Sequence, residues 1–276
     1  MIYEKIPLKQ PGSQPYACVQ TYLLNHSDRI AIGKRPLVIV CPGGGYSFTS
    51  EREAEIIALQ YNAMGYHAAV VYYSCSPAVY PTALLEVADT VLMMKRHAEE
   101  WYIDPDHIIL IGFSAGGHLA ADFCLNWSKP FLSEKLQCVS RELKPAGMIL
   151  GYPVITSGQY AHRDSFRCLL GDRYDELLTQ ESLELQVNKD VPPAFIWHTV
   201  TDEAVPVQNS LFLAEALIRQ GIPTEYHLYP KGVHGLSLAN RLTADTKTER
   251  EEPSCTSWLA LSETWLKNLC GELKAE

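Results

Sequence analysis

The sequence predicts an α/β protein built on a mostly parallel central sheet with helices on both faces. Three observations carry this prediction. Short β-branched runs, such as residues 37–41, recur along the chain and end at proline or glycine, as strands buried on both faces do. Amphipathic segments of helical length alternate with these runs. Hydrophobic residues make up 47% of the 276 residues and charged residues 20%, which is enough to bury a large core.

The elements of the first half of the chain follow from their patterns. Residues 16–24 alternate loosely between polar and apolar, which is typical of an exposed edge strand. Residues 37–41 and 68–73 are continuous apolar runs and are expected to be buried strands. A helical pattern over 51–65 ends at a glycine, which is well suited to the end of a helix. A longer helix is predicted over 82–101, where apolar residues recur every three or four positions.

The alternation continues through the second half. A strand predicted at 107–111 is followed by a helix that begins after Ser114. Further strands are expected at 146–150, 194–199 and 224–228, and further helices at 207–219 and 256–269. Two stretches fall outside this rhythm: a polar and aromatic insertion at about 158–190, expected to form a short cap, and a charged loop at 240–253. Because no linker interrupts the chain, residues 1–276 are expected to form a single domain.

Charge and cysteine content exclude several classes of protein. The chain has 23 Lys and Arg against 32 Asp and Glu, a net charge of −9, and its cations are scattered, which argues against a nucleic-acid or anionic-membrane partner. Neither a membrane-spanning apolar run nor a signal peptide is evident. The eight cysteines lie mostly in apolar segments without a CxxC pair, so we expect buried thiols and a cytoplasmic location.

The strongest local signal is the segment GFSAG at residues 112–116, placed where a predicted strand ends and a helix begins. A serine at such a sharp turn is held in a strained conformation, and its flanking glycines are needed because larger side chains would collide with the strand and the helix. Ser114 is therefore the candidate nucleophile.

A serine hydroxyl needs a base to accept its proton, and the base needs an acid to orient it. In sheets of this kind both partners follow later strands, the acid before the histidine. Asp202 lies just after the predicted strand at 194–199, and Glu203 is an alternative acid. His234 follows the next strand in a loop flanked by glycines. Ser114, Asp202 and His234 are the predicted catalytic residues.

A glycine-rich turn, PGGGY at residues 42–46, follows the first buried strand. Backbone N–H groups can stabilise the oxyanion of acyl transfer where no side chain blocks the approach. Gly44 and Gly45, together with the N–H of Ala115, are the candidates for this oxyanion hole. Neither of the glycine motifs that cradle phosphate is present.

Weaker candidates have ordinary structural alternatives. Tyr46 and Tyr80 either flank the substrate or pack in the core, and His198 either lines the pocket or is a buried histidine with satisfied hydrogen bonds. The segment DPDH at residues 104–107 resembles a metal cluster but is better explained as a turn made by its Pro and Asp. We therefore predict no metal and no cofactor.

These segments resemble an α/β-hydrolase of the esterase/lipase branch, close to the acetyl-xylan-esterase-like enzymes. The matching segments span most of the chain: PGGGY at 42–46, Pro81, GFSAGGHLA at 112–120, HTVTDEAVPV at 198–207 and GVHG at 232–235. The resemblance implies the α/β-hydrolase fold, a triad of Ser114, Asp202 and His234, and an oxyanion hole at the glycine loop. Pro42 stands where many relatives carry histidine, and PGGGY is similar to the sugar-ester members.

The resemblance implies a serine carboxylic-ester hydrolase that deacetylates a sugar or short oligosaccharide through an acyl-enzyme. The same residues suit a peptidase or an amidase such as a formamidase, and a binding protein with a decayed site is a third alternative. The expected partner is a small ester molecule. An edge strand near Tyr16 permits a homo-oligomer.

Overall fold

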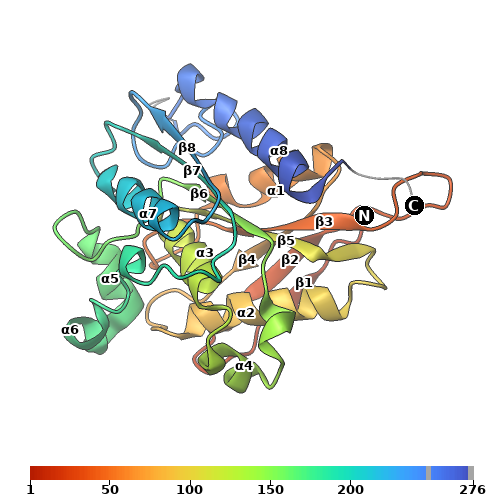
Figure 1. Ribbon diagram of the computed structural model, residues 1–276, viewed down its shortest axis with the longest axis horizontal. Coiled ribbons are helices and arrows are strands. Elements are labelled where there is room, and N and C mark those ends of the chain that lie inside the picture. The colour runs from red at the N-terminus through yellow and green to blue at the C-terminus, as the bar shows by residue number, and fades with distance from the viewer. Residues whose placement is uncertain (247–249, 273–276) are drawn as a thin grey trace.

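The computed structural model describes residues 1–246 and 250–272. In this part of the chain an eight-stranded sheet has the order β1-β2-β4-β3-β5-β6-β7-β8 (Figure 1). Strands β3 to β8 pair in parallel, and β1 and β2 are antiparallel additions at one edge. The strands are β1 (Lys5–Pro7), β2 (Cys18–Tyr22), β3 (Arg35–Cys41), β4 (His67–Tyr72), β5 (Ile103–Phe113), β6 (Gly147–Gly151), β7 (Ala194–Thr199) and β8 (Thr224–Tyr229).

Helices cover both faces of the sheet, which confirms the predicted fold class (Figure 1). The α-helices are α1 (Glu55–Ala63), α2 (Thr82–Arg96), α3 (Ser114–Asn126), α4 (Pro130–Leu136), α5 (Arg163–Leu170), α6 (Tyr174–Leu177), α7 (Gln208–Arg219) and α8 (Ser257–Cys270). Short 3₁₀ helices are η1 (Glu51–Glu53), η2 (Ser140–Leu143), η3 (Gly171–Arg173), η4 (Leu183–Leu185) and η5 (Pro253–Cys255).

The period-two alternation of each strand divides the core into two layers. In β3, Ile39 packs with the residues of α2, α3 and α7 on one face, and Val40 packs with those of α1 and α8 on the other. Every residue of β3 is buried, as the continuous apolar run predicts. The carboxyl ends of the parallel strands consequently meet at one edge of the sheet, where loops can place polar side chains side by side.

The predicted edge strand at 16–24 needs a correction. Its core, β2, lies between β1 and β4 and has only one residue that is not buried, so the edge of the sheet is β1. Strand β1 has three residues, which is too short for a period-two pattern to stand out from the sequence. Its Pro7 suits an edge position, because proline cannot donate a hydrogen bond to a further strand.

Strand β5 begins earlier than predicted and includes the DPDH segment. The register with β3 shifts between the pairs Arg35–Ile103 and Leu37–Ile108, so the intervening residues form an irregularity within the strand. The DPDH segment forms a turn within the strand, because Asp104 Oδ1 accepts a hydrogen bond from the N–H of Asp106. Among residues 1–246 and 250–272 no group of His, Cys, Asp and Glu could hold a metal ion.

The insertion at about 158–190 holds α5, η3, α6 and η4. Its α5 is tied to the loop before α2, where the N–H of Tyr80 donates to the carbonyl of Leu169 over 2.7 Å.

All eight cysteines are thiols, four buried and four half-buried. In the described ranges no helix combines the length and the apolar character that crossing a membrane requires. The predicted loop at 240–253 includes residues 247–249, which lie outside the described residues.

Candidate active site

Ser114 sits at the sharp turn between β5 and α3. It has a φ of 53°, a left-handed conformation that costs a non-glycine residue roughly 1–2 kcal/mol. The turn is possible because Gly116 has no side chain. The backbone of β3 lies so close that a Cβ on Gly116 would be 2.1 Å from the carbonyl oxygen of Cys41. The hydroxyl remains reachable, with 8% of Ser114 exposed. The sequence signal GxSxG thus describes a local geometry that only small flanking residues allow.

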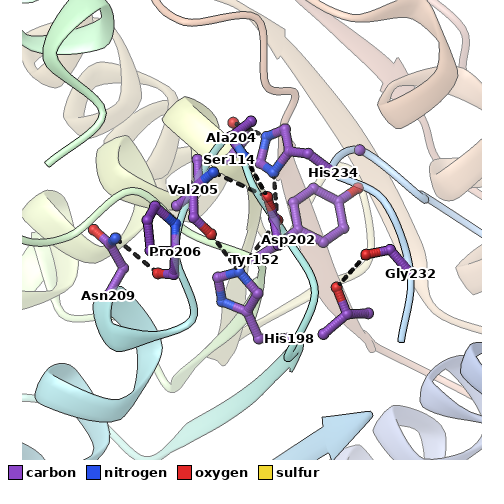
Figure 2. A network of polar contacts seen from close by, with 12 residues as sticks. Ser114, Tyr152, His198, Asp202, Ala204, Val205, Pro206, Asn209, Gly232 and His234 are labelled. Carbon is purple, nitrogen blue, oxygen red and sulfur yellow. Dashed lines mark hydrogen bonds and ion pairs between the residues drawn. The ribbon is translucent and has the colours of Figure 1, made fainter. Parts of the chain in front are cut away.

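The structure brings Ser114, His234 and Asp202 together (Figure 2). The Ser114 hydroxyl donates to His234 Nε2 over 2.8 Å, and His234 Nδ1–H donates to Asp202 Oδ2 over 2.6 Å. Asp202 follows β7 and His234 follows β8, so the two loops meet at the carboxyl edge of the sheet. Glu203, the alternative acid, is exposed to solvent, and the carboxylate in contact with His234 belongs to Asp202.

Asp202 is held as a buried carboxylate by four donors. Its Oδ1 accepts the N–H groups of Ala204 and Val205 over 3.0 and 2.9 Å, and its Oδ2 accepts both His234 and His198. Burial alone would raise the pKa of Asp202, but the hydrogen bonds from His198 and His234 outweigh it and lower the pKa below its ordinary value. Asp202 is therefore a fixed anion whose second oxygen orients the His234 ring.

His198 does not line the pocket around Ser114, which corrects its assignment as a substrate-binding candidate. It is fully buried behind Asp202. Its Nε2 lies 3.0 Å from the carbonyl of Val205 and 3.2 Å from Asp202 Oδ2, and both groups can only accept, so this nitrogen carries the proton. Its Nδ1 then accepts the hydroxyl of Ser210 over 2.7 Å. His198 positions Asp202 from the interior, as Figure 2 shows.

The glycine loop after β3 is held open beside Ser114. Gly44 has a φ of 128°, and a Cβ there would lie 2.1 Å from the carbonyl oxygen of Phe48, so no other residue fits. Gly44 and Gly45 line the same pocket as Ser114 and His234. Ala115 lies in the first turn of α3, where the backbone N–H groups have no acceptor within the helix and the helix dipole favours negative charge. These backbone groups suit a developing oxyanion.

A buried carboxylate connects the glycine loop with the histidine side of the site. Glu53 Oε2 accepts the N–H of Gly43 over 2.9 Å, and Glu53 Oε1 accepts the hydroxyl of Tyr152 over 2.6 Å. The Tyr152 ring packs edge-on against His234, with ring centroids 5.1 Å apart (Figure 2). Neither Glu53 nor Tyr152 belongs to a recognisable motif, so sequence reasoning could not find this support.

Tyr46 and Tyr80 also need a correction, because they pack rather than line the pocket around Ser114. Tyr46 is 3% exposed, and its hydroxyl donates to His118 Nδ1 over 2.9 Å. His118 Nε2–H in turn donates to the carbonyl of Glu181 over 3.0 Å, which fixes the tautomer. Tyr46 therefore anchors the end of the glycine loop to α3. Tyr80 is half-buried against the core and connects α2 to the insertion.

The pocket at Ser114 has a volume of about 320 Å³. The glycine loop, Ser114 and His234 line it, and the insertion supplies His162, Asp164 and Cys168. His162 Nδ1 lies 2.8 Å from the Ser165 hydroxyl and 3.4 Å from the Ser165 N–H, a contact that caps α5. Burial lowers the pKa of His162, and the charge of nearby His234 lowers it further. His162 went unnoticed in the sequence because the insertion carries no motif.

Two buried carboxyl groups meet where the insertion packs on α3. Asp122 and Glu181 are 2% and 1% exposed. Burial raises the pKa of both, the charge of Asp122 raises that of Glu181 further, and Lys129 only partly offsets these effects. Glu181 Oε2 has no hydrogen-bond partner in the described part of the chain. Glu181 consequently keeps its proton to a higher pH than an exposed glutamate, because a second buried charge near Asp122 would be repelled.

This pair should make stability fall as the pH rises. In the unfolded chain the carboxyls titrate near 3.8 and 4.5, and in the folded chain both pKa values are raised. Above these unfolded values the native state binds more protons, so the free energy of unfolding decreases with pH. Glu181→Gln removes the charge and is expected to be more stable than the native protein by about 1–2 kcal/mol at alkaline pH. Urea unfolding at several pH values measures this difference.

Glu176→Gln provides a matched control for that experiment. Glu176 lies on the same insertion but is exposed and paired with Arg173, so its replacement should leave the pH dependence of unfolding unchanged. If Glu181→Gln and the native protein lost stability in parallel between neutral and alkaline pH, the pKa of Glu181 would not be raised in the folded protein.

A mostly parallel sheet with serine, aspartate and histidine after β5, β7 and β8 at its carboxyl edge defines the α/β-hydrolase fold. The family model described as BD-FAE matches residues 26–217, and the chain belongs to this family. The resemblance seen in the sequence is therefore confirmed.

Solved structures resemble the chain over nearly its whole length. An acetyl ester-xyloside bifunctional hydrolase from Caldicellulosiruptor lactoaceticus is 32% identical, with a TM-score of 0.84 and coverage of 97% of each chain. The carboxylesterase Cest-2923 from Lactobacillus plantarum is 30% identical, with a TM-score of 0.83 and coverage of 100% of each chain.

Among curated proteins, endo-1,4-beta-xylanase B of Butyrivibrio fibrisolvens is 36% identical over 220 residues, which are 78% of this chain and 34% of that protein. The acetylxylan esterase of Xylanibacter ruminicola is 29% identical over 208 residues, which are 73% of this chain and 41% of that protein. The chain thus spans about a third to a half of the length of the curated relatives that it matches.

Proposed function

We propose that this protein is a serine carboxylesterase that removes a small acyl group, above all acetyl, from a sugar or short oligosaccharide. The observation that carries the proposal is the hydrogen-bonded chain from Ser114 through His234 to Asp202, open to a pocket beside the glycine loop. The names of the relatives support the substrate class, because they include an acetyl ester hydrolase and an acetylxylan esterase.

The first half of the reaction transfers the acyl group to the protein. His234 Nε2 accepts the Ser114 proton while Ser114 Oγ bonds to the ester carbonyl carbon, and the electron pair of the C=O bond moves to the oxygen. The N–H groups of Gly44, Gly45 and Ala115 stabilise this oxyanion. When the oxyanion collapses, the C–O bond to the sugar breaks, and His234 gives its proton to the leaving oxygen.

The second half releases the acid. His234 accepts a proton from water as the water oxygen attacks the acyl carbon, and the same backbone groups stabilise the second oxyanion. Collapse breaks the bond to Ser114 Oγ, which regains its proton from His234. Asp202 remains ionised throughout and stabilises the imidazolium, in keeping with its lowered pKa. These steps require neither a metal nor a cofactor.

The size and walls of the pocket favour a short acyl group. Its volume of about 320 Å³ lies at the small end of the ~300–1,000 Å³ typical of small-molecule sites. The insertion at 158–190 serves as the cap of a single domain and determines the substrate specificity. His162 lines this pocket with its Nδ1 in contact with Ser165 of α5, so Nε2 is the ring nitrogen that remains to hydrogen-bond with a hydroxyl of the sugar.

Acetate release from acetylated xylo-oligosaccharides, compared with hydrolysis of p-nitrophenyl acetate, butyrate and octanoate, tests the proposal. We expect sugar deacetylation, and acetate preferred to butyrate by at least about tenfold in kcat/KM. A preference for octanoate would overturn the short-acyl assignment. Faster cleavage of aminoacyl nitroanilides would make the protein an amidase or peptidase, and the absence of any hydrolysis would make it a binding protein.

A further inference from the structure

A second hollow lies next to the pocket of Ser114, over the antiparallel edge of the sheet. It has a volume of about 540 Å³, and the rings of Tyr3, Tyr16 and Tyr72 line it. We call it the tyrosine groove. Tyr3 and Tyr16 are 53% and 52% exposed, which is unusual for two large aromatic side chains that share one concavity. The reaction described above uses none of these tyrosines.

One short segment of chain separates the groove from the pocket. Along residues 48–52, Phe48, Ser50 and Arg52 line the pocket of Ser114. The two residues between them, Thr49 and Glu51, line the tyrosine groove. Because alternate residues of one segment face the two hollows, the wall between them is a single backbone thick. A ligand that fills the pocket and continues over this wall enters the groove.

The tyrosine rings are held in place before any ligand arrives. Gln20 Nε2 donates to the Tyr3 hydroxyl over 2.8 Å, and the N–H of Cys75 donates to the Tyr16 hydroxyl over 2.9 Å. The Tyr3 ring also packs edge-on against Tyr22, with centroids 5.3 Å apart. Rings that are already ordered lose little conformational entropy on binding, so their contacts contribute more fully to affinity.

The charges in the groove select against an anionic occupant. Glu51 and Glu55 contribute two carboxylates, and Lys5 contributes one ammonium group. Carboxylates accept hydrogen bonds from hydroxyl groups, and aromatic faces attract the slightly positive C–H groups of a sugar ring. Aromatic rings combined with hydrogen-bond acceptors therefore suit a neutral polyhydroxylated chain.

We propose that the tyrosine groove is an accessory binding site for the carbohydrate chain that bears the ester, one or more sugar units away from the acyl group in the pocket. The inference rests on the proposed function, because it takes the ester to be that of a sugar. It predicts that oligosaccharide esters are better substrates than monosaccharide esters, and that the advantage depends on Tyr3 and Tyr16.

The test compares a substrate that fits the pocket with one that spans both hollows. For the double variant Tyr3→Ala/Tyr16→Ala we expect kcat/KM on acetylated xylohexaose to fall about tenfold, mainly through KM. Activity on p-nitrophenyl acetate should stay within about twofold, because this ester lies in the pocket alone. Tyr3→Phe keeps the ring and should retain most of the xylohexaose activity. Phe131→Ala, which removes an exposed ring on α4, is the matched control and should change neither substrate.

Binding of unacetylated xylohexaose to Ser114→Ala, measured by calorimetry, tests the groove without catalysis. Adding Tyr3→Ala/Tyr16→Ala to this variant should abolish the binding. A native protein that hydrolysed p-nitrophenyl acetate but no sugar acetate would refute the proposed substrate, whereas xylohexaose binding would still report on the groove separately. Equal losses on both substrates, or no loss on either, would overturn the inference. A dimer that the double variant converts to monomer, with sugar kinetics unchanged, would show that the groove is an interface between copies.

Discussion

Ser114→Ala is expected to lower kcat for acetyl esters by about 10⁵- to 10⁶-fold. The variant loses the only atom that forms the acyl-enzyme, while the oxyanion groups and the pocket remain. Alanine accepts the φ of 53° at about the same cost as serine, so the free energy of unfolding should change little. Burst kinetics with p-nitrophenyl acetate measure the effect directly, since the burst of nitrophenol reports the acyl-enzyme.

Labelling with a fluorophosphonate distinguishes this prediction from a loss of folding. The native protein should be labelled at Ser114, and Ser114→Ala should not be labelled although its thermal unfolding is unchanged. Ser133→Ala on α4 is the matched control, because Ser133 is a half-buried serine whose hydroxyl donates to the carbonyl of Pro130. If Ser114→Ala retained more than about a thousandth of the activity, another nucleophile would be responsible.

The parts of the fold that the sequence predicts well are those in which one pattern has one cause. A continuous apolar run such as β3 can satisfy its burial only inside a covered sheet, so the strand and its two layers follow together. The GFSAG segment is similar, because Gly116 touches the backbone of Cys41 and the spacing tolerates no other residue. Strand β1 and helix α4 are short, and tertiary packing rather than local pattern stabilises them.

The candidate site likewise has residues that the sequence predicts and residues that it does not. Ser114, Asp202 and His234 could be found because each follows a strand in a fixed order, which is information carried by the chain. Tyr46 was ambiguous because its ring can turn toward the pocket or toward His118, and only the packed structure decides between them. His162 gave no signal, because it reaches the pocket through an insertion whose fold is set by contacts with α3.

Asp202→Asn is expected to lower kcat by about 10⁴-fold with little change in KM for a small ester. The two oxygens of Asp202 differ in their partners: Oδ1 accepts two backbone N–H groups, and Oδ2 accepts His234. In the variant the amide oxygen must remain with the backbone donors, so the NH₂ group faces His234 Nδ1. Nδ1 of His234 then becomes an acceptor, and the ring proton moves to Nε2. A protonated Nε2 can no longer accept the proton of Ser114.

His198 makes this prediction specific to the present chain. Its Nε2–H also points at the position of Asp202 Oδ2, so an NH₂ group there faces two imidazoles, one of which is fixed as a donor by the carbonyl of Val205. Only the His234 tautomer can adjust. Fluorophosphonate labelling should slow in parallel with kcat, since Ser114 itself is intact but lacks its base. Asp202→Asn with labelling and kcat near native values would mean that Asp202 does not orient His234, and Glu203→Gln, at the exposed neighbour, should leave both rates unchanged.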